Sequence, residues 1–136
     1  MRPSSRTGSR RTIKITARIE RWPVAGAFII ARGAKTHVDV IVVAVSDGVH
    51  IGCGEATPIY YKGETAEGAV AAITALSRDV DREALQSCLP AGAARNALDN
   101  ALWDLAAQQQ GIAVWQLAGL PPPQPLVTAM TVSLGT

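Results

Sequence analysis

The chain has 136 residues, of which 48% are hydrophobic and 18% are charged. This composition is typical of a globular protein and excludes an intrinsically disordered one, and the length suits one domain with a substantial core. A formal net charge of +2 gives little support for nucleic-acid binding. No apolar run approaches the ~20 residues that a membrane-spanning helix needs.

The first eleven residues are basic and polar, with no hydrophobic period. Arg10 and Arg11 form a pair of the kind found in twin-arginine export signals, but charged residues interrupt the apolar segment that such a signal requires. Cys53 and Cys88 have no metal-ligand or CxxC spacing, so we expect reduced thiols. We therefore predict a disordered basic tail over residues 1–11 and a cytoplasmic protein without membrane or nucleic-acid partners.

The ordered part is predicted to begin near Thr12 with a half-buried strand. Apolar residues alternate there with polar ones, at Ile13, Ile15, Ala17 and Ile19. Pro23 is expected to end this strand. Residues 24–35 contain two glycines and lack a clean period, so we predict a loop there.

The next segment predicts a β-hairpin. Val38–Val45 is rich in β-branched residues, an Asp-Gly turn follows at 47–48, and Val49–Ala56 forms the returning arm. Gly52 and Gly54 in that arm indicate either a bulge or a close backbone approach.

From Thr65 onward the hydrophobic period becomes helical. We predict a helix from Thr65 to about Val80, a weaker one over Arg82–Leu89, a long helix that Gly111 terminates, and a short one over Val114–Leu117. The buried face of the long helix is expected to consist of Ala94, Ala97, Leu98, Ala101, Leu102 and Leu105.

Strands followed by helices predict an α+β fold, with a three-stranded antiparallel sheet followed by a helical bundle. Pro121–Pro123 is a stiff connector. Leu126–Leu134 then alternates as one more strand, which we expect to belong to a separate unit.

Three segments carry a resemblance to a known family. They are GxGEA at Gly52–Ala56, ALDNALWDLAAQQQGIAVWQLAGL at Ala97–Leu120 and AMTVSL at Ala129–Leu134. The sequence resembles the N-terminal capping domain of the enolase superfamily, within the mandelate racemase/muconate lactonizing enzyme family. The family motif is in register at Asp99, Ala101, Leu102, Asp104, Leu105, Leu117 and Gly119, whereas Val114 stands where the family often has Pro.

This resemblance implies three parts. Residues 1–11 are the tail, residues 12–120 are an enolase-type capping domain, and residues 121–136 are a linker and the first strand of a TIM-type barrel. The rest of that barrel, about 200 residues or more, is absent from the sequence. We expect the full-length parent to be a homo-oligomer.

Two further segments are similar to dipeptide epimerases that act on L-Ala-D/L-Glu, namely FIIARG (Phe28–Gly33) and GEATPIYYKGET (Gly54–Thr65). The similarity implies that Arg32 pairs with the side-chain carboxylate of the substrate. A guanidinium suits that role because it forms two parallel charge-assisted hydrogen bonds with a carboxylate. The plain alternative for Arg32 is a solvated loop cation.

The same similarity implies substrate contacts for three other residues. Tyr60 lies on a loop that closes over the barrel mouth, Thr131 lies on the first barrel strand, and Phe28 walls the pocket beside Arg32. Each has a plain alternative: surface packing for Tyr60, a β-forming residue for Thr131, and a core anchor for Phe28.

The implied chemistry is proton abstraction α to a carboxylate by a lysine, with Mg²⁺ stabilising the enediolate. The sequence contains only Lys14, Lys35 and Lys62 and no K-x-K motif. Asp99 and Asp104 are about 140° apart around a helix, so they do not form a carboxylate dyad. We therefore expect neither catalytic residues nor metal ligands in this chain.

Three hypotheses remain open at this point. The first is the specificity part of a magnesium-dependent dipeptide epimerase, an isomerase that acts on a small dipeptide together with the missing barrel. The second is a cycloisomerase, an o-succinylbenzoate synthase or an N-acylamino acid racemase of the same superfamily. The third is a stand-alone α+β binding module without catalytic descent.

Overall fold

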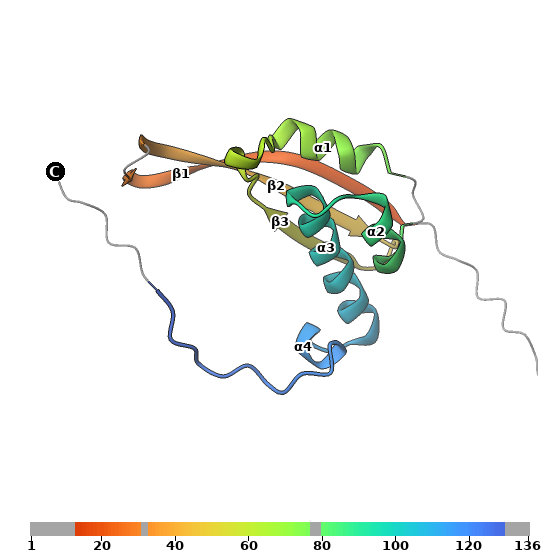
Figure 1. Ribbon diagram of the computed structural model, residues 1–136. Coiled ribbons are helices and arrows are strands. Elements are labelled where there is room, and N and C mark those ends of the chain that lie inside the picture. Colours follow the sequence, from red (N-terminus) through yellow and green to blue (C-terminus); the bar gives the residue numbers. More distant parts are fainter. Residues whose placement is uncertain (1–12, 31–32, 77–79, 130–136) are drawn as a thin grey trace, which may run out of the picture.

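A computed structural model describes residues 13–30, 33–76 and 80–129 (Figure 1). The predicted α+β architecture is confirmed, with an antiparallel sheet of three strands in the order β1-β2-β3 and helices after it. The strands are β1 (Lys14–Ile30), β2 (Gly33–Ser46) and β3 (Ile51–Ala56). The helices are the 3-10 helix η1 (Tyr60–Lys62), α1 (Ala66–Thr74), α2 (Arg82–Cys88), α3 (Ala93–Gln110) and α4 (Val114–Leu117).

β1 and β2 form a hairpin longer than predicted. The expectation that Pro23 ends the first strand and that residues 24–35 form a loop is wrong, because β1 continues to Ile30 and β2 begins at Gly33. An edge strand has one side without a neighbour, so it tolerates proline. The pairing is irregular only between Pro23 and Phe28, and the end of the hairpin projects beyond the helices (Figure 1).

β2 and β3 pair antiparallel, which confirms the predicted hairpin. Asp47 organises the turn between them. Its Oδ1 accepts hydrogen bonds from the backbone N–H groups of Val49 at 2.9 Å and His50 at 2.7 Å. Its Oδ2 accepts one from Nε2 of Gln109, near the end of α3, at 2.9 Å. Hydrogen bonding, most of all from the His50 backbone, holds the pKa of Asp47 far below its ordinary value of 3.8.

The helices begin and end where local chemistry favours it. Thr65 caps α1 by accepting a hydrogen bond from the Gly68 N–H at 3.0 Å. α1 ends at Thr74, and Ala75, Leu76 and Val80 are not helical, so the predicted extension to about Val80 is wrong. Gly111 ends α3 with a φ of 65°, as predicted.

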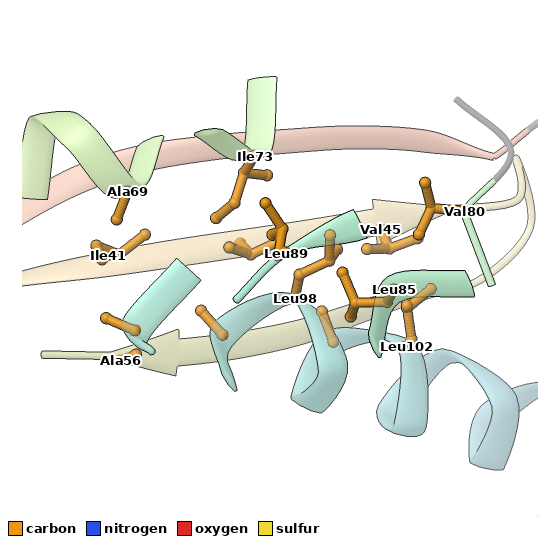
Figure 2. Close-up of a cluster of buried hydrophobic side chains, with 14 of the residues drawn as sticks. Ile41, Val45, Ala56, Ala69, Ile73, Val80, Leu85, Leu89, Leu98 and Leu102 are labelled. Atoms are coloured by element: carbon orange, nitrogen blue, oxygen red, sulfur yellow. The ribbon is translucent and has the colours of Figure 1, made fainter. Parts of the chain in front are cut away.

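The core lies between one face of the sheet and the helices. Figure 2 shows Ile41 and Val45 of β2 facing Ile73 of α1 and Leu98 and Leu102 of α3. The predicted face of α3 is confirmed, since all of its residues are buried except the half-buried Ala94. No helix in the described part of the chain is long and apolar enough to cross a membrane.

α3 lies directly against the backbone of β3. A Cβ atom added at Gly54 would lie 2.0 Å from the carbonyl oxygen of Ala97, and one added at Gly52 would lie 2.2 Å from that of Ala101. The pairing of β2 with β3 is regular through both glycines. The two glycines therefore permit a close backbone approach and do not form a bulge.

Side chains of α3 also form hydrogen bonds with backbone groups on the edge of β3 that pairs with no strand. Asp104 Oδ2 accepts a hydrogen bond from the Cys53 N–H at 2.8 Å. Gln108 Nε2 donates to the Ile51 carbonyl at 2.8 Å and to Asp104 Oδ2 at 3.1 Å. Asp104 of the family motif thus binds the backbone of β3.

After α4 the described chain is exposed and forms no further helix or strand up to residue 129. Residues 126–129 of the predicted strand Leu126–Leu134 are therefore not in a strand here, and residues 130–134 lie outside the described residues.

The close approach predicts that Gly54 does not tolerate a side chain. Gly54→Ala should lower the free energy of unfolding by about 3 kcal/mol, because the new methyl group meets backbone atoms of α3 that cannot rotate away. Urea unfolding followed by circular dichroism measures the change. Cys53→Ala, at the exposed neighbouring position, should stay within about 0.5 kcal/mol of the original chain and serves as the control. Equal stabilities of the two variants would contradict the prediction.

The lowered pKa of Asp47 predicts a pH-dependent contribution to stability. The folded state favours the carboxylate, so the contribution is complete above the ordinary pKa of 3.8 and is lost as the pH falls below it. Asp47→Asn should lower the melting temperature at pH 7, and the gap to the original chain should narrow below about pH 4. Thermal melts from pH 7 to pH 2.5 measure this, with Glu83→Gln as a control for the loss of one exposed acid. A difference in melting temperature that stays constant with pH would contradict the prediction.

Candidate functional site

A cavity of about 570 Å³ lies where the first half of β2 meets the segment after β3. Its volume is within the range of small-molecule sites. It is lined by Gly33, Ala34, Lys35, Thr36, His37, Val38, Asp39, Thr57, Pro58, Tyr60, Glu64, Thr65, Ala66 and Glu67. Two segments that are distant in sequence, the end of the long hairpin and the Pro58–Gly63 loop, therefore share one hollow.

Three ionisable side chains enter the lining from β2. Lys35, His37 and Asp39 occupy every second position of the strand, so the pleat places them on one face. The sequence did not group these residues, because the strand was predicted to begin at Val38 and so left Lys35 and His37 outside it. The period-2 spacing of these three residues is the signal that identifies them.

Asp39 is paired across the sheet with Arg21. The guanidinium meets the carboxylate through two hydrogen bonds, Nε to Oδ1 at 2.7 Å and Nη2 to Oδ2 at 2.9 Å. Their hydrogen bonding lowers the pKa of Asp39 and raises the pKa of Arg21, and the nearby charge of Glu67 adds to the second effect. Asp39 is therefore charged at neutral pH and already engaged by a cation.

Tyr60 connects the two sides of the cavity. It is exposed on η1, and the Lys35 ammonium lies 5.0 Å from the centroid of its ring. This is within the range of a cation–π contact. The Tyr61 ring lies edge-on to the Tyr60 ring, with 5.5 Å between the centroids.

The other predicted substrate residues are placed less directly. Phe28 is half-exposed on β1 opposite Lys35, and it belongs neither to the cavity lining nor to the buried core of the described residues. Arg32 directly precedes the cavity residue Gly33 in sequence, but Arg32 and Thr131 both lie outside the described residues.

The acidic residues of α3 have structural partners. Asp99 Oδ1 accepts a hydrogen bond from Arg82 Nε at 3.0 Å, and the Arg82 guanidinium lies 3.6 Å from the centroid of the Trp103 ring. Asp104 binds β3, as described above. These contacts occupy both carboxylates within the capping fold itself.

Among residues 13–30, 33–76 and 80–129, no group of three or more His, Cys, Asp or Glu side chains could hold a metal ion. Mg²⁺ prefers an octahedral set of oxygen ligands. The described residues do not fit such an ion.

The chain belongs to the mandelate racemase/muconate lactonizing enzyme family of the enolase superfamily, since the N-terminal domain of that family matches residues 12–119. It is 43% identical over 130 residues to the L-Ala-D/L-Glu epimerase of Escherichia coli (strain K12). This match covers 93% of the chain and 40% of the epimerase.

Two solved structures are also similar to this chain. An enolase family member from Agrobacterium tumefaciens with homology to dipeptide epimerases, with sodium and L-Ala-L-Glu bound, is 44% identical with a TM-score of 0.83. The match covers 90% of our chain and 39% of that one. A dipeptide epimerase from Methylococcus capsulatus, complexed with Mg and L-Arg-D-Lys, is 31% identical with a TM-score of 0.67, and the match covers 78% and 34% of the two chains.

These comparisons confirm the resemblance seen in the sequence and make dipeptide epimerases structural relatives of this chain. The chain spans about 40% of the length of the epimerase from Escherichia coli.

Proposed function

We propose that this chain is the substrate-specificity cap of a dipeptide epimerase. The observation that carries the proposal is the cavity shared by the hairpin end and the Tyr60 loop, in a chain whose relatives are dipeptide epimerases. One wall of that cavity lies mostly in the GEATPIYYKGET segment, and the other wall begins at Gly33, the last residue of the FIIARG segment. The cap holds these segments over the mouth of a C-terminal barrel.

In this proposal Arg32 binds a side-chain carboxylate of the dipeptide. Tyr60 forms a wall of the substrate pocket, with Lys35 against its ring. Phe28 closes the pocket beside Arg32, and Thr131 contacts the substrate from the first barrel strand. In this proposal Arg32 supplies the positive charge that selects an acidic side chain, because the lining itself contains Glu64 and Glu67 as well as Lys35.

The proposed reaction inverts an α-carbon by removing and returning its proton. In this proposal the lysines that move the proton and the ligands of Mg²⁺ belong to the barrel. Residues 12–120 form the cap, residues 121–136 form the linker and first barrel strand, and residues 1–11 form a basic tail. By itself the chain does not epimerise dipeptides.

A graft tests the proposal directly. Residues 12–120 of this chain should replace the matching part of the Escherichia coli L-Ala-D/L-Glu epimerase and give an active enzyme, because the two sequences are 43% identical over a 130-residue match. The measurement is exchange of the glutamate α-proton of L-Ala-D-Glu with deuterium, followed by NMR.

The original Escherichia coli enzyme is the positive control, and the 136-residue chain alone should show no exchange. A folded graft that is inactive on every dipeptide offered would contradict the role as an epimerase cap. Exchange by the isolated chain would contradict its proposed dependence on the barrel.

The proposed role of Arg32 predicts a substrate-dependent loss. In the active graft, Arg32→Met should lower kcat/KM for L-Ala-D-Glu by about 10- to 100-fold, as expected for a lost charge-assisted pair. For a dipeptide without a side-chain carboxylate, the same substitution should change kcat/KM little. Arg18→Met, at an exposed arginine of β1 that pairs with Glu20, is the matched control. Equal losses on both dipeptides would exclude carboxylate recognition by Arg32.

A further inference from the structure

Glu64 joins two parts of the molecule that are distant in sequence. Its Oε2 accepts a hydrogen bond from the Ile59 N–H at 2.7 Å, and its Oε1 accepts one from the Ala93 N–H at 3.1 Å. Ile59 immediately precedes η1, which carries Tyr60, and Ala93 is the first residue of α3. One half-buried carboxylate therefore links the Tyr60 turn to the longest helix.

The start of α3 is shaped to receive this carboxylate. Its N-cap residue is Gly92, which has no side chain to accept a hydrogen bond from the helix. A Cβ atom at Gly92 would lie 2.2 Å from Glu64 Oε1, so the glycine leaves the space that the carboxylate occupies. A negative charge is also favourable at a helix N-terminus because of the helix dipole.

The Tyr60 turn is closed by its own backbone around Ile59. The Ile59 carbonyl accepts hydrogen bonds from the Lys62 N–H at 2.9 Å and the Glu64 N–H at 3.3 Å. Gly63 ends the turn with a φ of 79°, and its N–H donates to the Tyr60 carbonyl at 3.0 Å. Because the turn is a closed unit, a bond that fixes Ile59 fixes the whole turn.

We infer that Glu64 is a positioning residue for substrate recognition, holding the Tyr60 turn on α3 so that Tyr60 remains on the wall of the cavity. The sequence gives no signal for this role, because both hydrogen bonds of Glu64 depend on the three-dimensional structure. The role in recognition rests on the proposed function, whereas the link itself does not.

Amide hydrogen exchange in the 136-residue chain tests the link. In Glu64→Ala, the amides of Ile59 and Ala93 should exchange about tenfold faster, as expected when a charge-assisted hydrogen bond is lost. Glu83→Ala, which removes an exposed acid of α2, should leave both rates unchanged. An unchanged rate at Ile59 in Glu64→Ala would overturn the inference.

A double variant separates loop positioning from simple helix capping. In Glu64→Ala with Gly92→Ser, the serine gives α3 a cap of its own, so the melting temperature should recover. The Ile59 amide should still exchange fast, because serine at position 92 does not replace the bond to the loop. Recovery of slow exchange at Ile59 in the double variant would mean that Glu64 only caps the helix, and would overturn the inference.

The graft on the Escherichia coli barrel supplies the readout of recognition. There, Glu64→Ala should raise KM for L-Ala-D-Glu about tenfold with little change in kcat, and Gly92→Ser should not reverse the effect. An unchanged KM together with fast Ile59 exchange would overturn the positioning role and leave the proposed function standing. An inactive graft with an unaltered cap would contradict the proposed function, and the exchange rates then decide the link independently.

Discussion

The contact between α3 and the glycines of β3 is the constraint on which the other parts of the structure depend. Gly52 and Gly54 let the helix backbone come so close that even a methyl group would collide with Ala97 or Ala101. At this distance Asp104 and Gln108 reach the backbone of β3, and Leu98 reaches the core. A wider separation of α3 from β3 would break these hydrogen bonds and at the same time open the core.

The same contact determines where the cavity forms. With α3 fixed on the sheet, its first residue lies within reach of Glu64, and Glu64 in turn holds the Tyr60 turn. At the other end of α3, Gln109 binds Asp47 and fixes the β2–β3 turn. The helix carries none of the cavity-lining residues. Its contribution is to bind Glu64 at one end of the sheet, where the lining residues lie, and the β2–β3 turn at the other end.

The sequence predicted the elements whose signal is local. The period of α3, its terminal Gly111 and the Asp-Gly turn all depend on neighbouring residues, and the structure confirms them. Pro23 was misread because its tolerance depends on β1 being an edge strand, which is a property of the sheet. The two hydrogen bonds of Glu64 join residues that are 5 and 29 positions apart, so no period in the sequence predicts them. The family motif identified the relatives, whereas the cavity required the three-dimensional arrangement of two segments.

The two edges of the sheet are not equivalent. On β3, helix side chains occupy backbone groups that a further strand would need, at Ile51 and Cys53. On β1, the described chain places no strand on the outer side. Addition of a strand from any other polypeptide is therefore directional: the sheet can be extended next to β1 but is closed next to β3. Pro23 and the charged pair of Arg18 and Glu20 lie on that extendable side, where they make pairing with an arbitrary strand less favourable.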